Sequence, residues 1–416
     1  GHRGLLDVLR HVHPAMPEQQ RAPDLKNTFV SSSSEVPSFF EIPRPFTAKR
    51  RERPVARTGT MAPSLPTVDF SAFMSDEGVV VGDEPTAAQL SCAARINDTC
   101  TDNGFLYLTN FGLTDEDVAD AFAKSAALFA LSGDEKTKLK PYDPVTNLGF
   151  SAFASEALNA RRPADLREGF KYKNKDVFDN AMDGTPPGFA DTCEGFYRKC
   201  LTAARRIAVA CALALELPKE DSRFFERNFT AVDQCTLQFL HFPPVDPSVT
   251  TKHDDDDIAT QLRVGEHTDF GMVTLLFHDS SVNGAGLQVK KASGDQVGGT
   301  AGGEFDGADW VEAPGRGGST AIVNTGALMA RWTNDEWRAT AHRVVAGPTE
   351  VASKDRYSIA FFFDPDKESV IETHPACLAR TGKDAKYASI SAKDFVMMKI
   401  MEMQKTAAEA GVKAAY

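Results

Sequence analysis

Short apolar runs dominate the chain after residue 233, and Gly, Pro or Asp clusters separate each run from the next. They are CTLQFLHF (235–242), MVTLLFHD (272–279), GLQVKK (286–291), STAIVNTG (319–326), HRVVAG (342–347) and RYSIAFFFDP (356–365). Short runs rich in β-branched and aromatic residues, bounded by turn residues, are typical of strands. Many such strands favour an antiparallel barrel or a double-sheet jelly roll over a parallel sheet.

The part of the chain before residue 233 has a helical period. The run LPTVDFSAF (65–73) predicts a short opening strand. The next segment, 85–112, predicts a helix, a turn at Gly104 and a strand through Phe105 to Leu108.

Two further helices are expected in this half. One covers about 115–131 and ends where Gly133 caps it. The other covers 194–217, because Pro218 ends the run. The apolar face of the first helix contains Val118, Phe122, Ala126 and Phe129.

These patterns predict a mainly β protein with helices, whose core is an antiparallel barrel or a double-sheet jelly roll. We expect three segments: a flexible extension over 1–61, a helical and strand region over 62–230, and the β core over 231–416. The core ends in an amphipathic helix that starts after Ser391. Two Gly- and Asp-rich stretches, 251–261 and 292–309, are expected to be loops.

Composition narrows the function classes. The 416 residues carry a formal net charge of −12, which argues against a nucleic-acid partner because phosphate binding needs a clustered basic surface. No apolar stretch is long enough for a membrane span. The seven cysteines form no C-x-x-C pair, which fits reduced thiols in the cytoplasm. The mildly basic 1–61 segment leaves organelle targeting open, and we expect a monomer.

The segment GEHTDFGMVTLL (265–276) places His267 and Asp269 two positions apart ahead of an apolar run. In an extended strand, residues i and i+2 point to the same face, so both side chains can reach one metal ion. A third ligand must come from elsewhere, and His342 in TAHRVV is the candidate. Two imidazoles and one carboxylate suit Fe(II) oxygenase chemistry, whereas a structural zinc site needs four protein ligands.

A second polar pair lies fourteen residues after His342. Arg356 and Ser358 share a strand face in the apolar run RYSIAFFF. A guanidinium fork beside a hydroxyl is suited to a carboxylate, which accepts two parallel charge-assisted hydrogen bonds.

The acidic run HDDDD (253–257) could also indicate a calcium site. Its spacing is not that of a calcium-binding loop, however, and a solvated acidic run is the simpler interpretation.

Taken together, HTDFGMVTLL, GLQV, VNTG, ATAHRVV and RYSIAFFF resemble the catalytic half of the iron(II)/2-oxoglutarate-dependent dioxygenases of the isopenicillin N synthase-like family. PTVDF, NGFLYLTNFG, LFALSGDEKTKLK and DLREGFKYK resemble its N-terminal region, so the resemblance covers roughly residues 65–400. It implies a double-stranded β-helix (jelly roll) core, with Fe(II) ligands at His267, Asp269 and His342. It also implies that Arg356 and Ser358 hold the distal carboxylate of 2-oxoglutarate, with O2 as the other co-substrate.

The chain departs from this family at two places. Many relatives have Asn-x-Tyr on the strand entering the core, and the tyrosine hydroxyl also binds 2-oxoglutarate; here Leu240 and Phe242 occupy those positions. Relatives often have Gly-Asp where this chain has Gly326 and Ala327. Neither change affects the iron ligands, but one neutral hydrogen bond of roughly 1 kcal/mol would be missing from the co-substrate site.

The substrate wall is expected from less regular positions. Gln238, Leu240 and Phe242 should share a strand face, and the resemblance makes Phe362 a substrate-facing aromatic. Further wall residues are expected at Phe150 and Phe153, with Lys171 as a polar anchor for the small-molecule substrate.

The expected activity is oxidation of a small organic molecule by hydroxylation, desaturation or oxidative cyclisation, with release of succinate and CO2. Two alternatives remain open from the sequence. One is an Fe(II) oxidase that does not use 2-oxoglutarate and holds a substrate carboxylate with Arg356 and Ser358. The other is a non-catalytic small-molecule receptor on the same fold.

Overall fold

The computed structural model describes residues 65–74, 84–180, 182–245, 261–279, 286–291, 310–346 and 352–409. The expected 1–61 extension, the acidic run at 253–257, and the loops at 251–261 (except Gln261) and 292–309 lie outside these residues. No helix within the described ranges is long and apolar enough to cross a membrane.

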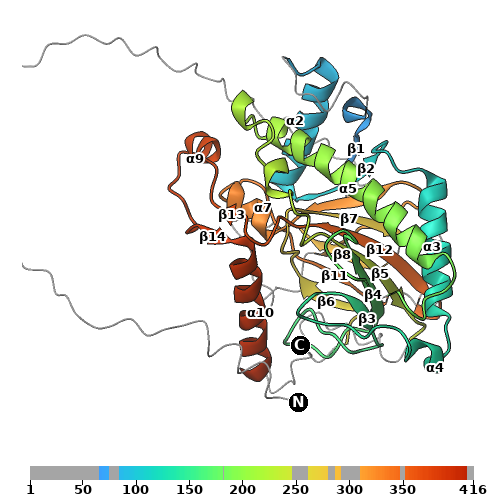
Figure 1. Ribbon diagram of the computed structural model, residues 1–416. Coiled ribbons are helices and arrows are strands. Elements are labelled where there is room, and N and C mark those ends of the chain that lie inside the picture. The colour runs from blue at the N-terminus through green and yellow to red at the C-terminus, as the bar shows by residue number, and fades with distance from the viewer. Residues whose placement is uncertain are drawn as a thin grey trace, which may run out of the picture. The chain divides into compact units, whose positions relative to one another are not determined.

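Two sheets form the core (Figure 1). The larger has eight strands in the order β1-β2-β10-β7-β12-β5-β4-β3, and the smaller has four in the order β6-β11-β8-β9. The larger sheet contains β1 (Thr67–Asp69), β2 (Phe105–Thr109), β3 (Gly149–Ser151), β4 (Glu168–Lys173), β5 (Thr236–Phe242), β7 (Val273–His278), β10 (Ala321–Thr325) and β12 (Arg356–Phe363). The smaller contains β6 (Val264–His267), β8 (Leu287–Lys290), β9 (Trp310–Glu312) and β11 (His342–Val344). All six expected strand runs after residue 233 are therefore strands.

The helices of the N-terminal half cover one face of the large sheet (Figure 1). They are α2 (Ala87–Asp102), α3 (Asp115–Phe129) and α5 (Phe189–Ala214); the short α4 (Gly133–Lys136) follows α3 along the chain. The C-terminal half adds α7 (Ala327–Trp332), α9 (Pro375–Thr381), α10 (Ala392–Glu409) and the small β13 (Val370–Ile371) and β14 (Ile390–Ser391) pair. As expected, α10 begins after Ser391, whose hydroxyl accepts a hydrogen bond from the amide of Asp394 at 3.0 Å.

The expected turn between α2 and β2 is confirmed. Gly104 has φ +77°, and a Cβ there would lie 2.4 Å from the carbonyl oxygen of Arg338. Only glycine meets both requirements without strain. The β2 strand is thereby placed beside β10.

Two expected helix ends are wrong. Gly133 does not cap α3, which ends at Phe129 with Ala130 as its C-cap; Gly133 starts α4, because Ser132 and Glu135 form a capping box there. Helix α5 begins at Phe189, five residues earlier than expected, and it ends at Ala214. The left-handed Gly188 before it redirects the chain into the helix.

Side chains alternate along each strand, so the two faces of the large sheet belong to two different cores. On β12, Ile359 and Phe361 pack with α5 in the core under the helices. Residues of opposite parity, such as Phe242 on β5 and Ile322 on β10, pack with Val344 of the small sheet. The even-numbered positions of β5, β7, β10 and β12 therefore face the interior between the two sheets. Strands β1 to β4 of the N-terminal half complete the same large sheet.

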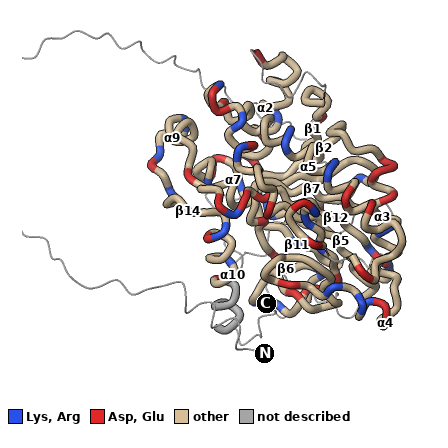
Figure 2. The backbone as a smooth tube through the Cα atoms, in the orientation of Figure 1, with Lys and Arg blue, Asp and Glu red and all other residues tan. Residues whose placement is uncertain are grey.

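Charged residues of both signs are interspersed along the described elements (Figure 2).

Candidate metal and co-substrate site

Three possible metal ligands converge in the interior between the sheets. His267 ends β6, Asp269 follows it, and His342 begins β11, where it pairs directly with His267. The Nε2 atoms of His267 and His342 lie 3.7 and 3.8 Å from Oδ1 of Asp269. One ligand atom from each residue lies within 4.8 Å of the others. The structure thus brings together all three residues proposed as ligands.

Backbone carbonyls orient both imidazoles. Nδ1 of His267 is 2.8 Å from the carbonyl oxygen of Gly265, and Nδ1 of His342 is 3.2 Å from that of Thr340. A carbonyl only accepts, so each Nδ1 carries the proton and donates it. Each Nε2 lone pair is then directed to the shared centre, the arrangement expected of metal-binding histidines.

The carboxylate of Asp269 is also fixed on its far side. Oδ2 accepts hydrogen bonds from the hydroxyl of Thr274 at 2.6 Å and from the side-chain amide of Asn324 at 2.7 Å. Burial alone would raise the pKa of Asp269, but His342, His267 and these two donors outweigh burial and lower it. Burial, aided by the nearby His342, lowers the pKa of His267 to about 4. At neutral pH the site therefore offers neutral His267 and an ionised carboxylate.

This set of donors fits Fe(II). Two imidazoles and one carboxylate on one side of an ion leave its other positions for exchangeable ligands. Bound Fe(II) with 2-oxoglutarate and O2 supplies the oxidation of a C–H bond. The residues of the chain orient the ligands and shield the site from water.

The arginine expected to hold a carboxylate lies in the same interior. Arg356 is 1% exposed and pairs across the strands with Phe242, whose ring centroid is 4.7 Å from its guanidinium carbon. Its Nη2 donates to Nδ1 of His278 at 3.1 Å. Among the described residues, Nε and Nη1 of Arg356 have no hydrogen-bond partner. Burial, aided by the charge of Arg263, lowers the pKa of Arg356 to about 9, so the group stays cationic.

Ser358 lies two residues along the same face and is 2% exposed. It pairs with Leu240 on one side and His278 on the other. A cation and a hydroxyl are thus present side by side on the large sheet, on the face that looks toward the metal ligands.

Of the seven proposed substrate residues, five lie on the interior face of the large sheet and two lie elsewhere. Gln238, Leu240, Phe242 and Phe362 share the interior face, by their parity with Arg356 on paired strands. Lys171 pairs with Gln238 on the neighbouring strand β4. Its Nζ lies 3.1 Å from Oε1 of Glu156 and 4.1 Å from the ring centroid of Tyr142.

The structure does not bring Phe150 and Phe153 to this interior. Phe150 packs against the core under the helices, on the other side of the sheet. Phe153 is 46% exposed.

Several residues around the site are not found by sequence reasoning. Asp165 accepts from the amide of Gly265, and Arg167 lies 3.4 Å from Asp165 and 3.3 Å from Glu156. These charges form a buried ionic cluster beside β6. Thr274 and Asn324 can be recognised from the sequence, because each is a polar residue in an apolar strand at a position that faces the interior.

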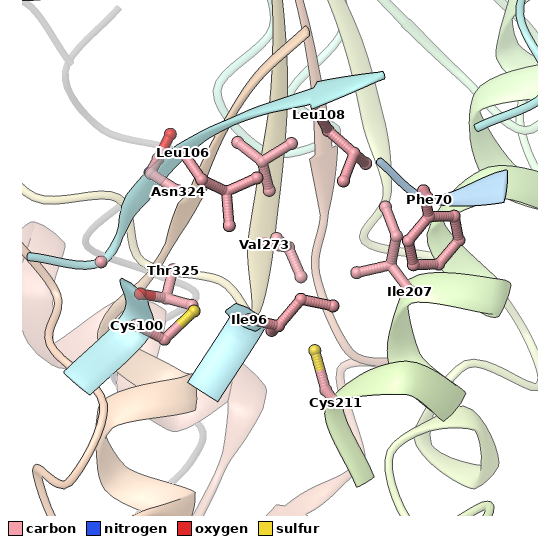
Figure 3. A pocket seen from close by; sticks show the side chains of 12 residues that line it. Phe70, Ile96, Cys100, Leu106, Leu108, Ile207, Cys211, Val273, Asn324 and Thr325 are labelled. Atoms are coloured by element: carbon pink, nitrogen blue, oxygen red, sulfur yellow. The ribbon is translucent and has the colours of Figure 1, made fainter. Parts of the chain in front are cut away.

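The cavity shown in Figure 3 is a separate feature. Ile96 and Cys100 of α2 and Ile207 and Cys211 of α5 point into it from the helix layer. Its lining is apolar apart from Asn324 and Thr325. It lies in the core under the helices, so it is a packing gap and not the place where a co-substrate reaches the metal.

Comparison with known proteins agrees with this geometry. Residues 65–186 match the family model described as "non-haem dioxygenase in morphine synthesis N-terminal", and residues 233–365 match the 2OG-Fe(II) oxygenase superfamily. The chain is 31% identical to the proline hydroxylase buaE of Petromyces alliaceus, over 68% of this chain and 84% of the relative. It is 29% identical to the 2-oxoglutarate-dependent dioxygenase htyE of Aspergillus rugulosus, over 76% and 92%.

Solved structures show the same likeness. A full-length Neurospora crassa protein in complex with alpha-KG and 5-formyluracil has a TM-score of 0.63 and 29% identity, covering 83% of this chain and 96% of that chain. Fold and site together define a non-haem Fe(II) oxygenase. The chain belongs to the 2OG-Fe(II) oxygenase superfamily.

It follows that the protein is an Fe(II)- and 2-oxoglutarate-dependent oxygenase with a jelly-roll core, as the sequence predicts. An oxidase that does not use 2-oxoglutarate and a non-catalytic receptor are not favoured.

Proposed function

We propose that His267, Asp269 and His342 bind Fe(II), and that Arg356 and Ser358 hold the distal carboxylate of 2-oxoglutarate. The observation that carries this assignment is the convergence of the three ligand atoms within 4.8 Å, with both Nδ1 atoms bonded to carbonyls. The buried guanidinium of Arg356 on the facing sheet supplies the charge that a dicarboxylate needs at its other end.

The assignment of Arg356 is tested by Arg356→Met. Loss of the guanidinium should raise the KM for 2-oxoglutarate about 10- to 100-fold, since a buried hydrogen-bonded charge pair is lost. Iron binding should be retained, because Arg356 has no contact with the triad. An unchanged KM would show that the distal carboxylate binds elsewhere.

We further propose that the substrate is a small, neutral, polar heterocycle. The interior beside the metal offers the amide of Gln238 and the ring of Phe362. Lys171 adds little net charge, because Glu156 already compensates it. A neutral molecule with amide-like groups suits this wall better than an anion.

Names of relatives supply two candidate classes. One relative is called a proline hydroxylase, and the Neurospora crassa protein was crystallised with thymine and with 5-formyluracil. Succinate release should be measured with a panel of pyrimidine bases and with proline. The proposal expects stimulation by a base and none by the zwitterionic amino acid; the reverse would contradict it.

Gln238→Ala tests the proposed substrate wall directly. It should raise the KM for the substrate while leaving the slow substrate-independent turnover of 2-oxoglutarate unchanged. Equal loss of both activities would mean that Gln238 supports the fold or the co-substrate instead.

We also propose that the protein acts as a monomer in the cytoplasm. Support for the cytoplasm comes from its seven cysteines, all buried and free, as in a reducing compartment. Light scattering of the purified full chain tests the oligomeric state, and fractionation of cells tests the location.

A further inference from the structure

A second arginine lies at the end of the interior that holds Arg356. Arg263 directly precedes β6 and is 0% exposed. Its Nη2 is 3.5 Å from the carbonyl oxygen of Pro243, and 3.4 Å from those of Ala352 and Lys354. Pro243 follows β5 and Lys354 precedes β12, so Arg263 is held where these two strands pair through Phe242 and Arg356.

The remaining donors of Arg263 are not used within the described part of the chain. Nε and Nη1 are buried and have no hydrogen-bond partner there, and no described carboxylate forms an ion pair with this side chain. Burial lowers the pKa of Arg263 to about 10, and the charge of Asp355 opposes this effect. The guanidinium therefore remains cationic at neutral pH, and a buried cation with unused donors is costly unless an anion meets it.

Arg263 and Arg356 lie near the same aromatic ring. Their guanidinium carbons are 5.9 and 4.7 Å from the ring centroid of Phe242. The charge of Arg263 is also among the causes that lower the pKa of Arg356. Two like charges are therefore held close together in a nonpolar setting, where their repulsion is only weakly screened.

The two carboxylates whose charges act on these arginines, Asp355 on Arg263 and Asp279 on Arg356, have other hydrogen-bond partners. Asp355 lies 2.8 Å from Nε2 of His241, and its side chain is 53% exposed. Asp279 accepts from the amide of Tyr357 at 2.9 Å. Within the described ranges, Asp355 forms no ion pair with either arginine. An anionic ligand would relieve the repulsion between the two cations.

We propose that Arg263 is the second cation of the pocket for the distal carboxylate of 2-oxoglutarate, alongside Arg356. It takes the part that the tyrosine hydroxyl plays in relatives, at the position where this chain has Phe242. The inference rests on the proposed function of Arg356 and goes beyond it by assigning a second residue that determines co-substrate specificity.

This arrangement selects keto acids with a second carboxylate. 2-Oxoglutarate would compensate the two buried cations, whereas a 2-oxo acid with a methyl end would leave both without a counter-charge. 2-Oxobutyrate is the matched probe, because it has the same keto acid group for iron and no distal carboxylate.

The test is anaerobic titration of the Fe(II)-loaded full chain with each keto acid, followed by the visible metal-to-ligand charge-transfer band. Arg263→Met should weaken 2-oxoglutarate binding about tenfold or more, and Arg263→Lys less. Binding of 2-oxobutyrate should be unchanged in both variants. A purely structural role for Arg263 would instead weaken both keto acids equally, and this result would overturn the proposal.

Arg205→Met is the control variant. Arg205 is on α5, in the helix layer; it also has a buried Nε without a partner among the described residues, and it donates to one carbonyl, that of Phe229 at 3.2 Å. Its removal should leave both affinities as in the wild type. If the wild-type chain gives no band with either keto acid, the iron and co-substrate assignment itself fails. If the wild type gives the band and Arg263→Met binds both keto acids normally, only the role of Arg263 is refuted.

Discussion

His342 and His267 lie directly opposite each other on β11 and β6, with ring centroids 4.2 Å apart. The register between these strands is irregular, because Val344 pairs with Val264. Between these two pairs β11 therefore has one residue and β6 has two, as in a β-bulge. In a regular strand Val264 and His267 would face opposite sides; here Val264 packs in the interior core and His267 reaches the metal site. The irregularity is what aligns both imidazoles.

Thr274 and Asn324 should control iron affinity without touching the iron. Both hold Oδ2 of Asp269. Thr274→Val and Asn324→Ala should each weaken Fe(II) binding about 10- to 100-fold, the usual cost of removing a hydrogen bond behind a metal ligand. Competition with a coloured chelator measures this. Thr236→Val, on the same interior face of β5, is the control and should bind iron normally. Unaltered affinity in both site variants would mean that Asp269 needs no such support.

Phe242→Tyr should strengthen binding of 2-oxoglutarate. The new hydroxyl would lie on the ring that contacts Arg356 and would restore the group found in relatives. The gain should be about fivefold in affinity, which corresponds to roughly 1 kcal/mol for one neutral hydrogen bond. Isothermal titration under anaerobic conditions gives the value directly. A folded variant with unaltered affinity would place the distal carboxylate away from Phe242.

Asp364 should make stability depend on pH. Its carboxyl packs against Gly271, where an added Cβ would lie 1.6 Å from Oδ1. Burial, and then the charge of Asp269, raises the pKa of Asp364 to about 7, while Lys173 opposes the shift. Between about pH 4 and pH 7 the folded chain keeps a proton that the unfolded chain loses. The free energy of unfolding therefore decreases across this window as pH rises, and the loss is complete above pH 7.

Asp364→Asn should remove this dependence. Urea unfolding of the metal-free protein at pH 5, 6, 7 and 8 should show the variant gaining stability relative to wild type as pH rises. Asp384→Asn, at an exposed position, is the control and should follow the wild type. Parallel curves for Asp364→Asn and wild type would show that Asp364 is ionised in the folded state.

Much of the site could be predicted from the sequence because it depends on local strand periodicity. His267 with Asp269, and Arg356 with Ser358, are pairs two residues apart, and two-residue spacing fixes a shared face. The capping box of Ser132 and Glu135 is also visible in the sequence, and it indicates that a new helix starts at Gly133.

Other features could not be predicted because they depend on contacts between distant segments. The irregular register of β6 against β11 follows from three-dimensional pairing. In the sequence, Arg263 is an ordinary cation at the start of a strand. Only the fold shows that residues next to β5 and β12 enclose it. The ionic cluster of Glu156, Asp165 and Arg167 forms only when the segment before β4 folds against β6.

The most direct test of the account is the number of Fe(II) ions bound per chain, measured by anaerobic titration of wild type and of His342→Ala. His342 lies 73 residues from Asp269 in the sequence and meets it only through the fold, so this variant tests the geometry itself. We predict one tightly bound Fe(II) ion in wild type, and loss of both tight binding and turnover in a folded His342→Ala. One ion bound equally tightly by both proteins would contradict it.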